Sequence, residues 1–113
     1  MKIIKKQISG SLLKKIAENS FGDLVKAVVD IKKEIMIIDA ELHADEEAFL
    51  LEKGSKQADL WGINLYPKIK TDDWIEFDSM INIRPASGNL NRSIGSSRIR
   101  KKIIKIVNNL IKK

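Results

Sequence analysis

The longest alternation of apolar and polar side chains runs over residues 74–85 and predicts the central strand of an antiparallel sheet. Successive side chains of a strand point to opposite faces of its sheet. One face would carry Ile75, Phe77, Ser79, Ile81 and Ile83, and the other Trp74, Glu76, Asp78, Met80, Asn82 and Arg84. This pattern is typical of a sheet that packs helices on one side and exposes the other.

The rest of the chain predicts two helices and several further strands. Apolar residues recur at helical spacing over residues 10–20 and 98–111, and serines stand where each helix would begin. Alternating β-branched residues predict strands over residues 24–31, 35–42 and 60–66. Residues 45–53 fit either a helix or a strand. We favour the strand, because a turn and another strand follow at the spacing of a hairpin.

These elements indicate an α+β fold: a single antiparallel sheet of four to five strands with the N- and C-terminal helices on one face. A chain of 113 residues suits a single domain. The absence of cysteine excludes disulfides and thiolate metal sites. The longest apolar run, residues 35–38, is far shorter than the roughly 20 residues of a membrane span. We therefore expect a soluble, cytoplasmic protein without a membrane partner.

The polar face of the predicted central strand is the leading candidate for a binding surface. Glu76, Asp78, Asn82 and Arg84 share it, and Asn64 would join them from the neighbouring strand. Such a surface could bind a small polar ligand or a second copy of the chain, with Arg84 contacting an anionic group. The competing interpretation is a solvated face with cross-strand ion pairs. The sequence thus favours a non-catalytic module for ligand binding or protein interaction.

A metal or acid/base site around the only histidine is the first alternative. His43 stands close to Asp45 and Glu46. An imidazole and carboxylates could ligate a divalent metal, or His43 could act as a base that Asp45 orients. The spacing matches no metal-ligand or catalytic motif, so a solvated turn competes with a small enzyme, and no cofactor can be named.

The basic C-terminal region is the second alternative. The net charge is +6, and residues 84–113 contain nine basic and no acidic side chains, whereas residues 30–59 contain four basic and nine acidic ones. Arg92, Arg98 and Arg100 surround a small polar loop and the start of the last helix. Backbone N–H groups and the helix dipole favour a phosphate or nucleic-acid backbone there. The competing interpretation is a solvated amphipathic helix.

Several ordered blocks of the chain resemble a small prokaryotic family of uncharacterised proteins, a domain of unknown function. The blocks lie at residues 41–46 (Glu-Leu-His-Ala-Asp-Glu), 60–67 (Leu-Trp-Gly-Ile-Asn-Leu-Tyr-Pro) and 76–85. The resemblance implies no activity, cofactor or partner. The chain departs from the family where Asp39-Ala40 replaces a pair of glycines, and where Ser97-Arg98 replaces acidic residues. The first departure makes the family's unusual turn near Asp39 less expected. The second makes the family's usual charge at the start of the last helix less expected.

Overall fold

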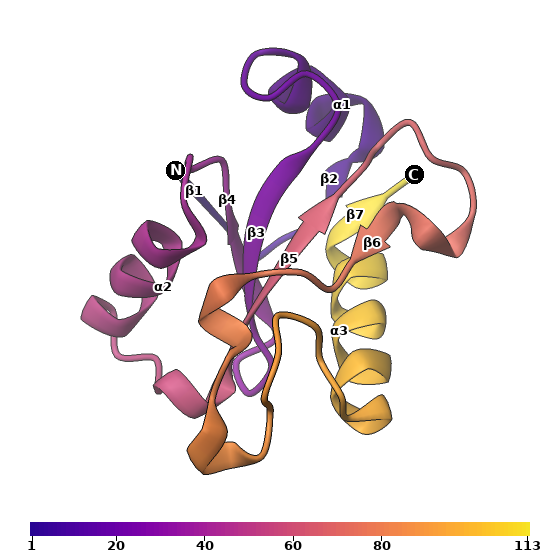
Figure 1. Cartoon of the computed structure of the whole chain (residues 1–113). Helices are drawn as coiled ribbons and strands as arrows, with labels where there is room; N and C mark the ends of the chain where they lie inside the picture. Colours follow the sequence, from indigo (N-terminus) through magenta and orange to yellow (C-terminus); the bar gives the residue numbers. More distant parts are fainter.

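A computed structural model describes all 113 residues and contains a five-stranded antiparallel sheet with three helices around it (Figure 1). The strand order is β1 (Lys2–Ile4), β4 (Ile35–Ile38), β3 (Val25–Asp30), β5 (Leu60–Leu65) and β6 (Ile75–Glu76). The helices are α1 (Gly10–Glu18), α2 (His43–Glu52) and α3 (Ser97–Leu110). The α+β class expected from the sequence is confirmed.

A second, two-stranded sheet joins the two ends of the fold. Strand β2 (Ile8–Ser9) pairs in parallel with β7 (Ile111–Lys112), so the start of α1 lies beside the end of α3. Strands of two residues are too short to produce a periodic pattern, and the sequence did not predict them. Short 3₁₀ turns complete the secondary structure: η1 (Gln57–Asp59), η2 (Asp72–Trp74), η3 (Met80–Asn82) and η4 (Pro85–Ser87).

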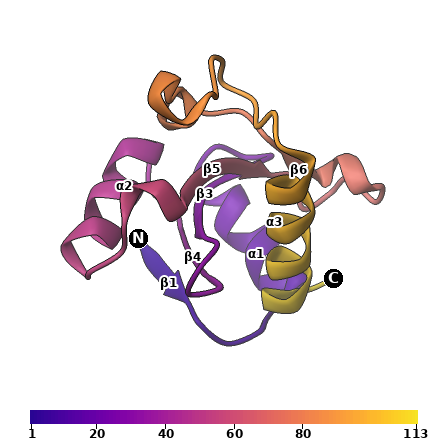
Figure 2. The ribbon, with the colours of Figure 1, turned by 90° about the horizontal axis from the view of Figure 1, so that it is seen from below.

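The larger hydrophobic core lies between the sheet and helices α1 and α3 (Figure 2). Its twenty buried residues include the apolar stripes of both helices and one face of the sheet. Each helix begins at a serine that accepts a hydrogen bond from a backbone N–H group, Ser9 from Leu12 at 3.1 Å and Ser96 from Ile99 at 3.2 Å. The two terminal helices therefore pack on one face, as predicted.

The sequence predicted that the opposite face of the sheet is exposed, but helix α2 covers part of it. The strand favoured for residues 45–53 is wrong, since these residues continue α2. Leu50 of this helix packs with Val28, Ile37 and Leu60 in a smaller core of four buried residues. A short apolar run cannot distinguish a strand from a buried helix, and here the packing against the sheet decides.

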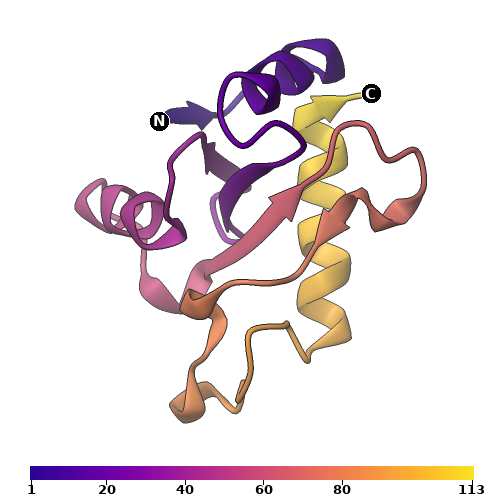
Figure 3. The same ribbon diagram turned by 45° about the horizontal axis from the view of Figure 1, so that its top comes forward.

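The long central strand predicted for residues 74–85 is also wrong. Pairing with β5 ends at Glu76, and the chain continues as a long loop that includes η3 and η4 before α3 begins (Figure 3). Asn82 is completely buried and Ile83 is 37% exposed, which reverses the expected surfaces. We call residues 77–96 the long loop.

Two buried asparagines replace the missing strand pairing. The Oδ1 atom of Asn82 accepts the Gly62 N–H at 2.8 Å, and its Nδ2 donates to the Gly62 carbonyl at 2.9 Å and to the Arg92 carbonyl at 3.0 Å. The Nδ2 of Asn89 donates to the carbonyls of Asn82 and Ser93, both at 2.7 Å. Side chains thus satisfy the edge of β5 while the backbone follows a different path.

The turn after β4 has the unusual backbone geometry that the glycine pair of the family implies. Asp39 has a φ of +71°, in the left-handed region that favours glycine. An aspartate is one of the few residues with a side chain that tolerates this conformation. The turn is therefore present although a glycine pair is not.

Candidate functional site

The five residues of the predicted polar face mainly hold the long loop and strand β6 against β5. Asn64 Nδ2 donates to Glu76 Oε1 at 2.8 Å and to the Asp78 carbonyl at 3.2 Å. The Tyr66 hydroxyl donates to the same Glu76 oxygen at 3.1 Å. Asn82 is bound to Gly62, as described above. These polar groups are therefore already engaged by the protein.

Arg84 has different partners from Asn64 and Glu76. Its guanidinium stacks 4.4 Å from the centroid of the Trp61 ring and lies 3.7 Å from Glu47 Oε2 of helix α2. It also donates to the Leu60 carbonyl. Burial lowers the pKa of Arg84, and the Glu47 carboxylate opposes that shift. Arg84 thus ties α2 and the long loop to β5, instead of facing a ligand on a shared polar surface.

The three residues of the predicted metal or acid/base site point in different directions. The His43 ring is buried, and its Nε2 lies 2.8 Å from the Ile63 carbonyl, so this nitrogen carries the hydrogen. Asp45 is exposed, whereas Glu46 is fully buried and accepts the Ala40 N–H at 3.2 Å. No group of three or more histidine, aspartate or glutamate side chains in the protein could hold a metal ion.

Burial shifts the pKa values of both His43 and Glu46. Burial lowers the pKa of His43, although the hydrogen bond to Ile63 opposes the shift, so the ring is neutral at pH 7. Burial raises the pKa of Glu46 to about 9, and its hydrogen bond from Ala40 only partly opposes this. Glu46 is therefore protonated at pH 7. Both groups are neutral parts of the interface between α2 and the sheet.

Replacing Glu46 with glutamine is expected to abolish a loss of stability that the wild type shows as the pH rises from 4.5 to about 9. With a pKa near 4.5 when unfolded and about 9 when folded, Glu46 keeps its proton only in the folded state between these values. Its stabilising contribution is complete below pH 4.5 and is lost as the pH rises through 9. Each pH unit in this window costs up to about 1.4 kcal/mol.

Urea denaturation at pH 6 and pH 8 measures this effect. The wild type should lose about 2 kcal/mol more than the Glu46→Gln variant between the two pH values. Glu52→Gln, on the exposed side of α2, is the matched control and should follow the wild type. Parallel declines in the wild type and Glu46→Gln would contradict the assignment of a protonated Glu46.

The predicted anion-binding arginines do not converge either. Arg92 Nε forms an exposed ion pair with Asp78 Oδ1 at 2.6 Å. Arg100 Nη1 donates to the Ile94 carbonyl at 2.5 Å, and Arg98 is exposed on the first turn of α3. Ser96 already caps the start of that helix. The basic residues of this region are thus dispersed, and two of the three arginines have partners within the protein.

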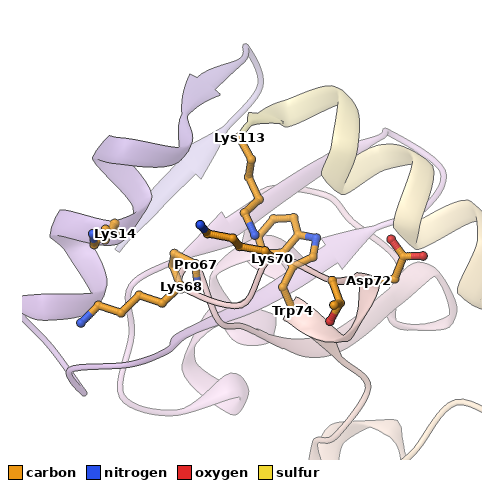
Figure 4. A pocket seen from close by; sticks show the side chains of 8 residues that line it. Lys14, Pro67, Lys68, Lys70, Asp72, Trp74 and Lys113 are labelled. Carbon is orange, nitrogen blue, oxygen red and sulfur yellow. The ribbon is translucent and has the colours of Figure 1, made fainter.

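Four lysines from distant parts of the chain surround a different hollow, of about 490 Å³ (Figure 4). We call it the lysine hollow. Lys14 comes from α1, Lys68 and Lys70 from the loop between β5 and β6, and Lys113 from the residue after β7. The remaining lining residues are Pro67, Thr71, Asp72 and Trp74. The arrangement depends on the β2–β7 pairing, which brings α1 and the chain end together.

The lysine hollow has a strongly positive lining. Four lysines and a single carboxylate line it, and this carboxylate, that of Asp72, lies on the far side of Trp74 from Lys14 and Lys68 in Figure 4. The compact charge and three N–H donors of a lysine ammonium suit the oxygens of a phosphate. The hollow can therefore hold an anion by direct charge attraction and hydrogen bonding.

Lys113 and Trp74 give the lysine hollow a fixed wall. Lys113 Nζ lies 4.2 Å from the centroid of the Trp74 ring and donates to the Ile69 carbonyl at 2.5 Å. Burial lowers the pKa of Lys113. Trp74 is only 5% exposed and packs in the larger core. These contacts attach the loop between β5 and β6 to the end of the chain.

Sequence reasoning missed the lysine hollow because lysines occur throughout the chain. Single lysines carry little information in such a composition, and these four are brought together only by the fold. The only local signal is the pair Lys68 and Lys70, which stands between Pro67 and Trp74.

These observations define a small α+β protein in which α1, the loop between β5 and β6 and the chain end line an open hollow with four lysines. Residues 2–110 match the family described as a protein of unknown function (DUF5674), and the chain belongs to that family. The resemblance noted in the sequence is thereby confirmed. Neither the curated proteins nor the solved structures contain a match to the chain. No helix has the length and apolar composition that crossing a membrane requires.

Proposed function

We propose that this protein is a non-catalytic binding module whose ligand presents clustered phosphate oxygens to the lysine hollow. The observation that carries this proposal is that four lysines, from three separate parts of the chain, line one hollow with a single carboxylate. Like charges held together raise the local potential, and an anion shared between them relieves their repulsion.

The partners of the other polar groups support this choice of site. The two ion pairs of the protein involve Arg84 and Arg92, and neither involves a lysine. Of the four lysines, Lys113 alone donates a hydrogen bond to the protein. By contrast, the Nδ2 atoms of Asn64 and Asn82 already donate to the protein, and of the guanidinium nitrogens of Arg84 only Nε and Nη1 have no hydrogen-bond partner. The lysine hollow therefore offers more unused donors than the polar face.

The chemistry of the lining residues favours binding without catalysis. Ammonium groups attract and orient phosphate oxygens, and the Trp74 indole provides a rigid wall. The neutral His43 belongs to the α2 interface and does not line the hollow. The histidine, the usual acid/base group near neutral pH, is thus absent from the lining.

Calorimetric titration with inorganic tripolyphosphate tests the proposal. The double variant Lys68→Gln/Lys70→Gln should bind about tenfold more weakly than the wild type, because it removes two donors from the lysine hollow. The matched control is Lys101→Gln/Lys102→Gln, which removes the same charge from exposed positions on α3. That control should bind within about twofold of the wild type.

The salt dependence provides a second readout of the same site. Raising the ionic strength should weaken wild-type binding more steeply than binding by the Lys68/Lys70 variant, since fewer charges then contact the ligand. Equal losses in both double variants would show that binding follows net charge alone. That result, or no measurable binding by the wild type, would refute a localised phosphate site.

A further inference from the structure

We propose a second binding site, for a small amphiphilic anion, in a hollow of about 540 Å³ between α2 and the strands β1 and β4. The ligand would be an apolar chain that carries one carboxylate or phosphate group. The hollow has an apolar floor of Ile3, Ile35 and Leu50 and a rim of Lys5, Lys33 and Lys53. We call it the amphipathic hollow.

The apolar floor exists because α2 and the Ile81 side chain of the long loop cover this face of the sheet only in part. Twenty residues are buried on the side of α1 and α3, but only four on the side of α2. Leu50 is fully buried, whereas Ile3 and Ile35 pack against the smaller core and stay half-buried. Figure 2 shows α2 on the side of the sheet away from α1 and α3, next to the edge strand β1. The floor is thus an incompletely covered part of the smaller core.

The rim carries three lysines, and the remaining lining residue, Ser55, donates to the Asp30 carboxylate at 2.7 Å. Lys5 follows β1, Lys33 lies in the turn between β3 and β4, and Lys53 ends α2. Lys53 Nζ lies 5.4 Å from the centroid of the Phe49 ring, and Lys33 Nζ lies close to Gly54. No aspartate or glutamate lines the hollow, although the chain around α2 is acidic. A ligand head group would therefore meet three cations.

The combination of floor and rim selects the class of ligand. A small polar anion would leave the isoleucines in water, and a neutral apolar molecule would leave the lysines without a partner. An amphiphilic anion satisfies both parts, since its chain covers the floor while its head group reaches the rim. The volume lies within the range of about 300–1,000 Å³ typical of small-molecule sites.

This site is independent of the lysine hollow. The two hollows share no lining residue, and the amphipathic hollow has three apolar residues where the lysine hollow has mainly charged ones. The two proposals can therefore fail separately.

Octanoate, octanol and acetate form a matched set of probes for calorimetry and for methyl NMR. Octanoate should bind at least about tenfold more tightly than octanol or acetate, because only octanoate has both an apolar chain and a charge. During the titration, the methyl signals of Ile3, Ile35 and Leu50 should shift together. Octyl phosphate should reproduce this pattern.

Variants then assign the head-group contact. Lys33→Gln/Lys53→Gln should weaken octanoate binding about fivefold or more and leave octanol binding unchanged, whereas Lys68→Gln/Lys70→Gln should bind octanoate as the wild type does. Octanoate binding no tighter than octanol binding would overturn the proposal. So would equal effects of the two double variants, or a response to vesicles of phosphatidylglycerol without any response to dissolved octanoate.

Discussion

Asn82→Ala is expected to lower the free energy of unfolding by about 4 kcal/mol, because this side chain pairs with both backbone groups of the buried Gly62. Its amide pairs with the N–H and the carbonyl of Gly62 and with the carbonyl of Arg92, over 2.8 to 3.0 Å. Alanine would leave the N–H and the carbonyl of Gly62 without a partner in a buried position, whereas the Arg92 carbonyl would keep its hydrogen bond from the Ser79 N–H at 3.1 Å. Each unpaired buried group costs roughly 1–3 kcal/mol.

Urea denaturation followed by circular dichroism measures this loss. Asn108→Ala is the matched control, since it removes the same amide from an exposed position on α3 and should change the stability by less than about 0.5 kcal/mol. An Asn82→Ala variant within about 1 kcal/mol of the wild type would show that Asn82 does not hold the long loop to β5.

Gly62→Ala is expected to lower the free energy of unfolding by about 3 kcal/mol through overpacking. A Cβ atom at this position would lie 2.6 Å from both Cβ and Oγ of Ser79 and 3.1 Å from Cγ1 of Ile81. Ser79 is only 1% exposed, so it cannot move aside without displacing its surroundings. The new methyl group would therefore push the long loop away from β5.

Gly95→Ala provides the comparison for Gly62→Ala in the same experiment. A Cβ atom at Gly95 would lie 3.5 Å from Asn89 Oδ1, which is an ordinary contact, so this variant should stay within about 0.5 kcal/mol of the wild type. Equal stabilities of the two variants would contradict the close approach of Ser79 to β5.

The sequence predicted the parts of the fold that depend on local periodicity. The stripes of α1 and α3 recur at helical spacing, and the strands β3, β4 and β5 show β-branched alternation, so their places in the chain were recognised. The serine caps were also recognised, because a helix start needs an acceptor for its unpaired N–H groups.

The parts that failed depend on contacts between distant residues. Residues 74–85 alternate as a strand would, but Asn82 reaches Gly62, twenty positions earlier, with its side chain. The pattern of apolar and polar residues does not show whether the hydrogen bonds at the edge of a strand come from a backbone or from a side chain. The side chains expected on one polar face are separated for the same reason, since Asn82 and Arg84 are bound to β5.

The sequence did not predict the lysine hollow for a different reason. Its members lie on α1, in the loop between β5 and β6, and after β7, and the parallel pairing of β2 with β7 helps to bring them together. That pairing involves two residues on each strand and leaves no periodic signal in the sequence. The hollow therefore depends on how the two chain ends pack together, which the sequence pattern does not show.

The central claim, that the lysine hollow binds phosphate oxygens, is tested most directly by the indole N–H signals of the two tryptophans during NMR titration with tripolyphosphate. Trp74 lines the hollow, whereas Trp61 lies beneath Arg84 and outside it. Our account predicts a saturable shift of the Trp74 signal together with the amides of Lys68 and Lys70, while the Trp61 signal stays unchanged. Equal shifts of both indoles, or shifts centred on the start of α3, would contradict it.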